Sequence, residues 1–253
     1  MKTGKTFFIT GTDTGIGKTM ATGCLTALLL AQGYRAVPYK PVQSGGIWED
    51  AKLIAEDVAF YRAVSSLAYE QDQLCTYCME PAVSPHLAAQ QTGTSIDPAR
   101  ISEQLDMLRE ENELVLVEGA GGLAVPLSSD DMSVYMTIDL LKELRLPLLL
   151  VTHPGLGTIN HTVLTAAYAQ LHGIPVLGLL INRFPGEPNE MEQDNFSMLV
   201  RLTGLPVVGT LPILAEPTAH AVRAALPAIE KTVNVNLLLQ RLEEAQNTWI
   251  HTT

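Results

Sequence analysis

Cysteine is scarce in this sequence of 253 residues, with only Cys24, Cys75 and Cys78 present. A secreted domain built on disulfides normally carries cysteine at higher density and in an even number. Three cysteines therefore favour a reducing compartment, and we expect the protein to be cytoplasmic. A signal peptide would show a long apolar stretch before a small-residue cleavage site, and the first residues predict none.

Positive charge is also scarce. The chain carries 16 Lys and Arg against 27 Asp and Glu, which gives a formal net charge of −11. Proteins that bind nucleic acids or anionic membranes normally present a basic face, and the sequence has no cluster of Lys and Arg. We therefore expect neither a nucleic acid nor a membrane as a partner. An anionic ligand would have to be held by a few well-placed cations and backbone N–H groups.

Long hydrophobic runs are missing, although 47% of the residues are hydrophobic. The stretch 146–151 is apolar but far too short to cross a bilayer. Short apolar runs alternate instead with longer stretches of helical periodicity. Strands are expected at residues 6–10, 36–39, 114–117, 148–151, 176–181 and 207–211, and helices at 20–31, 133–144, 159–172 and 190–202.

This alternation predicts an α/β fold. The apolar runs lack polar alternation, which is typical of strands buried on both faces of a parallel sheet. Strands separated by helices form right-handed crossovers, so we predict a doubly wound, mainly parallel sheet of about seven strands with helices on both faces. The chain has no repeat and no long linker, which predicts a single domain over residues 1–253. Ligands bind such sheets at the carboxyl ends of the strands.

A glycine-rich segment follows the first predicted strand. It reads Gly-Thr-Asp-Thr-Gly-Ile-Gly-Lys-Thr over residues 11–19 and precedes a predicted helix. Small residues let backbone N–H groups wrap a phosphate, Lys18 can reach the β- and γ-phosphates, and the Thr19 hydroxyl can bind Mg²⁺. Thr12 stands where the usual pattern has its first glycine, so a glycine-rich turn with a chance Lys-Thr is the alternative. The order of strand, loop, Gly-Lys-Thr and helix favours a P-loop NTPase fold.

Two further segments follow predicted strands. Glu118 comes directly after the third strand and precedes a glycine-rich stretch, which is typical of the strand-end acid that holds Mg²⁺ in P-loop proteins. The alternative is a charged strand end before a flexible turn. Lys40 follows the second strand, at the same predicted edge of the sheet as Lys18. A Lys-Pro at a strand end is by itself typical of a solvated charge, so its meaning depends on the residues around it.

Together these segments resemble the dethiobiotin synthetase family. The family pattern runs G-T-D-T-x-x-G-K-T, K-P-V-x-S-G, a Mg²⁺-binding Asp, E-P-x-S-P-H, V-E-G-A-G-G and I-N-H. Apart from the Asp, the corresponding segments occur here in the same order at residues 11–19, 40–45, 80–86, 117–122 and 159–161. Segment 80–86 contains one extra residue, Ala82. The resemblance extends from about Thr6 to about Glu216.

The resemblance implies a set of binding residues. ATP would be bound by Gly15, Ile16, Gly17, Lys18, Thr19, Met20, Gly119, Ala120 and Gly121, with Asn182, Arg183, Pro212, Ile213 and Leu214 around the adenine. Mg²⁺ would be held by Thr19, Asp57 and Glu118. Lys40 and Ser44 would meet the substrate and its carbamate, and Thr14 would lie near the transferred phosphoryl group. Lys18, Lys40 and Thr14 would be the catalytic side chains.

Two of these assignments depart from a simple match. The metal-binding Asp could be confused with Glu49, Asp50 or Glu56, and Asp57 is preferred because its spacing back from residues 84–86 best fits the family. Many relatives carry Glu where this chain has Gly15. Only the backbone can act at that position here.

The reaction that the resemblance implies joins 7,8-diaminononanoate, CO₂ and ATP into dethiobiotin, ADP and phosphate. The substrate carboxylate would meet the helix start formed by Gly157, Thr158, Ile159 and Asn160 of a neighbouring subunit, which implies a homodimer. Free N–H groups and the dipole make a helix start an anion site, and a capped helix start without a ligand is the alternative. A family tyrosine has no clean counterpart, since Asn195 or Phe196 falls near its place.

Two other kinds of P-loop protein remain as alternatives. A partitioning ATPase of the MinD and ParA kind usually carries an extra Lys early in the phosphate loop, and residues 12–16 contain none. It would also need a basic surface, which the net negative charge opposes. An amide-forming ligase of the cobyrinate type normally adds a glutaminase domain, and we expect the chain to be too short for one.

Overall fold

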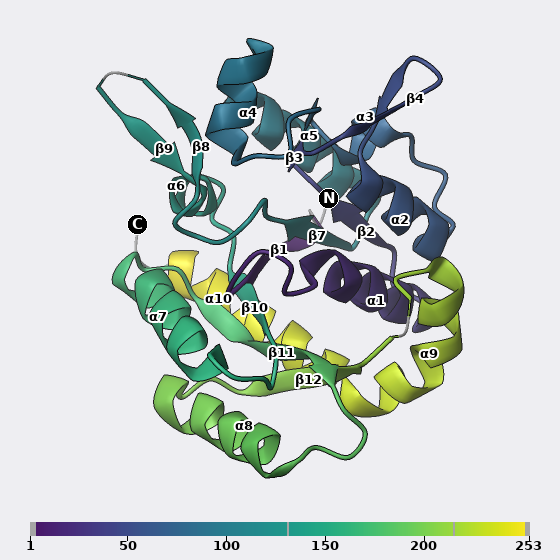
Figure 1. Cartoon of the computed structure of the whole chain (residues 1–253), viewed down its shortest axis with the longest axis vertical. Helices are drawn as coiled ribbons and strands as arrows, with labels where there is room; N and C mark the ends of the chain where they lie inside the picture. The colour runs from purple at the N-terminus through teal and green to yellow at the C-terminus, as the bar shows by residue number, and fades with distance from the viewer. Residues whose placement is uncertain (1–3, 131, 215, 251–253) are drawn as a thin grey trace.

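The computed structural model describes residues 4–130, 132–214 and 216–250, so the remaining positions of the predicted domain lie outside the description. Within it, six strands form one sheet through the centre of the molecule (Figure 1). They are β1 (Lys5–Gly11), β2 (Ala36–Tyr39), β7 (Leu114–Glu118), β10 (Leu148–Thr152), β11 (Val176–Phe184) and β12 (Val207–Pro212). Their order is β12-β11-β10-β1-β7-β2, and every neighbouring pair is parallel. The predicted class is confirmed, with six strands in place of about seven.

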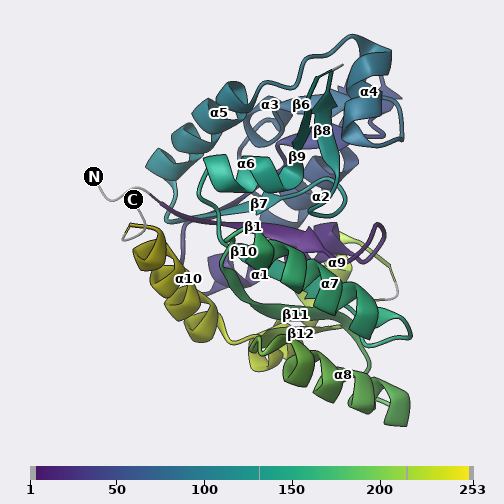
Figure 2. The same cartoon turned by 90° about the vertical axis from the view of Figure 1, so that its left-hand side faces the viewer.

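Helices cover both faces of the sheet (Figure 2). Buried apolar side chains form two clusters, and β1 contributes to both because Phe7 and Ile9 point to one face and Phe8 to the other. The first cluster contains residues of α1 (Lys18–Ala31), α9 (Ala219–Thr232) and α10 (Val235–Ile250). The second contains residues of α5 (Pro98–Glu111), α6 (Thr137–Glu143), α7 (Thr158–Leu171) and α8 (Glu190–Thr203). The two-sided burial accounts for the unbroken apolar runs in the sequence.

The remaining elements gather at one end of the molecule, in the upper part of Figure 1. They include the helices α2 (Glu56–Ser65), α3 (Gln71–Leu74) and α4 (Pro85–Thr92). Short strands pair two by two: β3 (Val42–Ser44) with β6 (Tyr77–Met79), β4 (Ile47–Glu49) with β5 (Lys52–Ile54), and β8 (Pro126–Ser129) with β9 (Val134–Met136). These pairs are separate from the main sheet, and all six strands that the sequence located belong to the main sheet.

The helix predicted over 133–144 is shorter in the structure. Val134–Met136 forms β9, which pairs antiparallel with β8, and the helix begins only at Thr137. A β-branched and an aromatic residue favour the strand there, since a pleated surface suits both. The fifth predicted strand extends three residues further than expected, because β11 ends at Phe184.

The strand order creates a crevice beside β1. The chain leaves β1 through α1 for β2 at one edge of the sheet, whereas the strands that come later continue on the other side from β10 to β12. Connections that diverge in this way leave space at the carboxyl ends of the central strands, where ligands bind. The glycine-rich loop 11–19 and Glu118 both lie at this edge.

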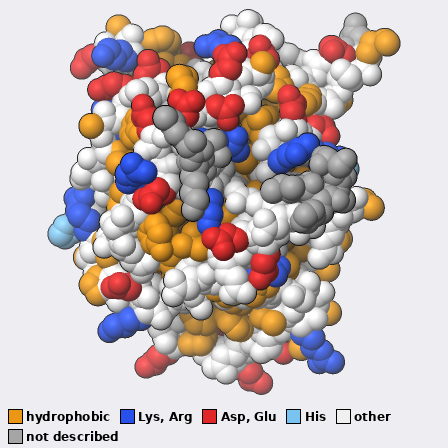
Figure 3. Space-filling view, turned by 180° about the vertical axis from the view of Figure 1, so that it is seen from behind, with side chains coloured by type: hydrophobic (Ala, Val, Ile, Leu, Met, Phe, Trp, Pro, Cys, Tyr) orange, Lys and Arg blue, Asp and Glu red, His pale blue; other side chains and the backbone are white. Residues whose placement is uncertain are grey.

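The surface agrees with the low positive charge. In the back view of Figure 3, Lys and Arg side chains lie apart from one another, between acidic, apolar and uncharged groups. Within residues 4–130, 132–214 and 216–250, no helix combines the length and apolar character needed to cross a membrane.

Candidate active site

The loop between β1 and α1 adopts a conformation that depends on glycine. Gly15 and Gly17 have φ angles of 75° and 91°, in the left-handed region. Gly17 immediately precedes α1, and a Cβ atom there would lie 2.1 Å from Nδ2 of Asn182. The glycines therefore let the loop turn sharply, so that the first N–H groups of α1 face the crevice.

Two side chains at the end of β11 hold this loop in place. Asn182 is buried, and its Nδ2 donates to the carbonyl of Ile16 at 2.9 Å. Arg183 donates from Nη2 to the carbonyl of Gly15 at 3.0 Å. Ile16 is buried and lines neither of the cavities described below, whereas Gly15 lines the larger one, where only its backbone can meet a ligand.

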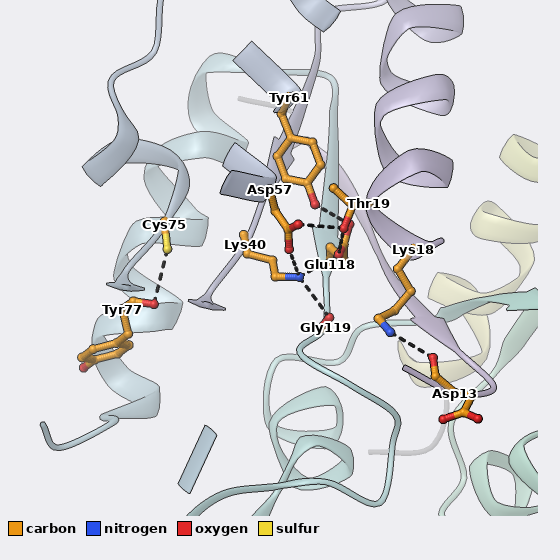
Figure 4. A network of polar contacts seen from close by, with 10 residues as sticks. All are labelled: Asp13, Lys18, Thr19, Lys40, Asp57, Tyr61, Cys75, Tyr77, Glu118 and Gly119. Carbon is orange, nitrogen blue, oxygen red and sulfur yellow. Dashed lines mark hydrogen bonds and ion pairs between the residues drawn. The ribbon is translucent and has the colours of Figure 1, made fainter. Parts of the chain in front are cut away.

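Four polar side chains meet beside the loop (Figure 4). The Thr19 hydroxyl lies 2.9 Å from Oδ1 of Asp57 and 3.0 Å from Oε1 of Glu118. The Lys40 ammonium lies 2.6 Å from Oδ2 of Asp57 and 2.7 Å from Oε1 of Glu118. It also donates to the carbonyl of Gly119 at 3.4 Å. They come from α1, the loop after β2, α2 and β7, so the cluster exists only in the folded chain.

The Thr19 hydroxyl lies at distances from the two carboxylates that suit Mg²⁺. Adjacent ligands of an octahedral Mg²⁺ lie about 2.9 Å apart, because its Mg–O distances are about 2.05 Å. The Thr19 hydroxyl has this separation from both Asp57 and Glu118. One hydroxyl and two carboxylates leave positions for phosphate oxygens and water, as Mg²⁺ sites in nucleotide-binding proteins require.

The two lysines of the site differ in their electrostatic surroundings. Burial alone would lower the pKa of Lys40, but attraction from Glu118 and Asp57 outweighs it and holds that pKa above the ordinary value. Burial lowers the pKa of Lys18, and Glu118 opposes this only in part. Lys18 donates to the uncharged backbone carbonyl of Asp13 at 3.2 Å, whereas Lys40 contacts two carboxylates. A phosphate would supply the negative charge that Lys18 is short of.

Two sizeable cavities adjoin the cluster. The larger, about 610 Å³, is lined by the predicted residues Thr14, Gly15, Gly17, Lys18, Thr19, Lys40, Ser44, Asp57, Glu118, Ala120 and Gly121. The second, about 510 Å³, is lined by the predicted residues Gly17, Thr19, Met20, Asp57, Asn182, Arg183, Pro212 and Leu214. Ile213 is 61% exposed and lines neither cavity. Gly119 is buried against the ring of Phe8. The structure thus brings residues predicted to bind the phosphates, the metal and the carbamate together in one cavity, and most of those predicted to bind the adenine in the next.

The acidic segment around Asp57 is separated by the fold. Glu49 and Asp50 lie on the exposed β4–β5 hairpin, where Asp50 has a φ of 44°. Glu56 lines the second cavity but has no part in the cluster. Asp57, in the first turn of α2, is the acid of this segment that contacts Thr19.

The start of α7 lies outside both cavities. Gly157 and Asn160 are exposed, whereas the Thr158 side chain is buried and shares a hydrogen bond of 2.7 Å with Thr152. The Thr158 N–H donates to the Gly155 carbonyl at 3.3 Å. The N–H groups of Ile159 and Asn160 lie in the first turn of α7, where N–H groups have no acceptor within the helix.

The two residues near the place of the family tyrosine are engaged within the chain. Asn195 donates to the Pro154 carbonyl at 2.7 Å and supports the loop before α7. Phe196 packs edge-on against Phe184, with ring centroids 5.8 Å apart.

The sequence analysis missed several side chains in or beside the cavities, among them Gln43, Phe60 and Tyr61. Gln43 lines the larger cavity, and Phe60 lines the second. Tyr61 donates its hydroxyl to Oε2 of Glu118, and its pKa is raised by burial first and then by the charge of Glu118 and Asp57. Helical spacing could have found Tyr61, which follows Asp57 by one turn on α2.

Comparison with known proteins decides the family. A family model described as AAA domain matches residues 5–221. The ATP-dependent dethiobiotin synthetase of Geobacillus sp. (strain WCH70) is 45% identical over 221 residues, which cover 87% of this chain and 90% of that protein. The synthetase of Clostridium kluyveri is 35% identical over 240 residues, covering 95% and 99%. This chain belongs to the dethiobiotin synthetase family.

The solved structures that it resembles share the fold. A ParA family ATPase from Chlorobium tepidum has a TM-score of 0.55 at 14% identity, covering 96% of this dethiobiotin synthetase homologue and 99% of the ATPase. The MinC:MinD cell division complex of Aquifex aeolicus gives 0.55 at 12% identity, covering 96% of each chain. This likeness confirms the P-loop fold. The much higher identity to the synthetases favours the ligase over the partitioning-ATPase alternative.

Proposed function

We propose that this chain is an ATP-dependent dethiobiotin synthetase that joins 7,8-diaminononanoate and CO₂ into a cyclic urea, with release of ADP and phosphate. The observation that carries the proposal is the position of Lys40. It shares the larger cavity with Lys18 and Thr19 of the phosphate loop and contacts both carboxylates that would bind Mg²⁺. A cation beside the phosphate site is what a reaction between a carbamate anion and ATP requires.

The nucleotide would span the two cavities. Its phosphates would lie on the N–H groups of the loop and on Lys18, and Mg²⁺ held by Thr19, Asp57 and Glu118 would neutralise phosphate charge. The base would extend into the second cavity, between the Asn182 side of the loop and Pro212 and Leu214. The three residues common to both cavities make this path continuous.

The first chemical step needs an uncharged amine. A free alkyl ammonium has a pKa of about 10, so most of it is protonated at neutral pH. The positive charges of Lys18 and Lys40 disfavour the ammonium form and then stabilise the carbamate that the amine forms with CO₂. Ser44 would hydrogen-bond this carbamate at the rim of the cavity.

The later steps need positioning more than a protein nucleophile. A carbamate oxygen attacks the γ-phosphoryl group, and ADP leaves while Lys18 and Thr14 hold the phosphoryl oxygens. The second amine then attacks the activated carbonyl carbon, and phosphate leaves as the five-membered ring closes. This closure is intramolecular, so holding the diamine in one geometry supplies much of its rate.

We further propose that the enzyme acts as a cytoplasmic homodimer of single-domain subunits spanning residues 1–253. The α7 start lies outside the two cavities that adjoin the cluster, so Gly157–Asn160 would serve the substrate of a second copy. Its free N–H groups would neutralise the substrate carboxylate in a protein with few cations.

The proposal is tested by measuring phosphate release from ATP with and without the diamine, in the presence of bicarbonate-derived CO₂ and Mg²⁺. Release should depend on the diamine and match the dethiobiotin formed one to one. ATP hydrolysis that is unaffected by the diamine would contradict the proposal and favour an ATPase switch.

A further inference from the structure

Tyr61 is buried next to the cluster but is not a member of the predicted site. It is 1% exposed and lies on the face of α2 that also carries Asp57. Its hydroxyl donates to Oε2 of Glu118, a side chain that is itself fully buried. Figure 4 shows the phenol pointing toward Glu118 and Thr19.

The two oxygens of Glu118 have separate partners. Oε1 receives the Thr19 hydroxyl at 3.0 Å and the Lys40 ammonium at 2.7 Å. Oε2 receives the Tyr61 hydroxyl. Rotation of the carboxylate would break contacts at both oxygens, so the phenol fixes which oxygen faces the metal-binding side.

We propose that Tyr61 is a positioning residue for metal binding: its hydroxyl holds Glu118 so that Oε1 faces the site of Mg²⁺. This rests on the proposed function for the identity of the metal. Groups that orient a metal ligand in this way typically change metal affinity by about 10- to 100-fold when they are removed.

The same helix explains why Tyr61 can act so rigidly. Asp57 and Tyr61 are one turn apart on α2, and between them Phe60 packs against Gly23 of α1, where an added Cβ would lie 2.5 Å from its ring. One rigid helix therefore fixes both Asp57, which would bind the metal, and Tyr61, which holds Glu118. Water cannot replace the hydroxyl, since Tyr61 and Glu118 are both buried.

The test uses Tyr61→Phe, which removes the hydroxyl and keeps the ring. ADP affinity is measured by titration calorimetry with Mg²⁺ and with a chelator, and the ratio of the two dissociation constants reports how strongly metal and nucleotide bind together. We expect this ratio to fall about tenfold or more, with metal-free ADP affinity within about twofold of wild type. Turnover should recover when Mg²⁺ is raised.

A matched control is Tyr39→Phe. Tyr39 is equally buried, and its hydroxyl contacts Thr76 and the Ile101 carbonyl, away from the cluster. It should lower the melting temperature to a similar extent and leave the ratio unchanged. If Tyr61→Phe misfolds, Tyr61→Met removes the same hydroxyl with a flexible side chain.

A wild-type ratio in a folded Tyr61 variant, or an equal fall in Tyr39→Phe, would overturn the proposal. Because the titration uses only ADP and Mg²⁺, it does not depend on which substrate the enzyme carboxylates. Failure of the diamine assay would not affect the result of this titration, and failure of the titration would not affect the diamine assay.

Discussion

Lys40 offers a perturbation whose effect can be worked out from the structure. Lys40→Gln removes the cation that lies 2.6 Å from Asp57 and 2.7 Å from Glu118. Breaking a buried ion pair by removing one partner costs about 3–5 kcal/mol, because the remaining charge is left without compensation. Asp57 is partly exposed and water can solvate it in part, so we expect a cost near the lower end.

For a chain of this size, 1 kcal/mol corresponds to about 2–4 °C in melting temperature, so the variant should melt roughly 6–12 °C lower without Mg²⁺. Millimolar Mg²⁺ should then raise the melting temperature more in the variant than in wild type, because the metal replaces the missing cation. Thermal unfolding measured with Mg²⁺ and with a chelator gives both values. Lys142→Gln, which removes a half-exposed lysine 3.9 Å from Asp139, is the control and should cost about 0.5 kcal/mol.

The pH dependence of the stability difference between wild type and Lys40→Gln follows from the direction of the pKa shift of Lys40. The folded-state pKa of Lys40 is raised, so its stabilising charge is present in full below the unfolded pKa of about 10.4 and is lost only as pH rises through the higher folded value. The contribution of Lys40 to the free energy of unfolding should therefore be constant between about pH 7 and 9.

In Lys40→Gln, single-turnover ring closure should be lost while ADP affinity is retained. A variant with wild-type stability and an unchanged response to Mg²⁺ would refute this account of the cluster.

Three further substitutions test other parts of the site. Lys18→Ala should lower turnover at saturating ATP by roughly 3 kcal/mol, or more than a hundredfold, in a steady-state assay, and near-normal turnover would contradict the phosphate-loop assignment. Asp57→Asn should raise the Mg²⁺ concentration needed for half-maximal turnover, whereas Asp50→Asn on the exposed hairpin should not. The reverse result would show that the assignment of Asp57 as the metal ligand is wrong. Gly17→Ala should destabilise the protein by roughly 2–3 kcal/mol in denaturant unfolding and weaken ADP binding, since it combines a left-handed φ with a 2.1 Å contact. Gly15 has a similar φ, and an added Cβ there would have nothing within 4 Å, so Gly15→Ala should show only the cost of the left-handed backbone. Equal losses of stability in the two variants would show that the contact with Asn182 does not contribute.

The sheet could be predicted because its strands are buried on both faces. Runs such as Leu148–Val151 contain no polar residue, and only a strand covered by helices on both sides requires that. The stretch 133–144 was harder, because its first residues form β9 through pairing with β8, a partner that helical periodicity does not reveal.

The site was predictable where a motif reports the backbone, as in the phosphate loop. It was less predictable where the direction of a side chain depends on the local backbone. Ile213 follows β12, between two residues that line the second cavity, and yet is 61% exposed. Tyr61 belongs to no motif. Helical spacing places it one turn after Asp57, but its partner Glu118 is remote in sequence and adjacent only in the fold.

The central claim, that this site carboxylates a diamine and closes a urea ring, is tested most directly with ¹³C-labelled bicarbonate. The enzyme is incubated with ATP, Mg²⁺ and 7,8-diaminononanoate, and the product is examined by mass spectrometry. The account predicts dethiobiotin with the label in its ring carbonyl, formed together with one ADP for each ring and lost in Lys40→Gln. ATP consumption without labelled product would contradict it.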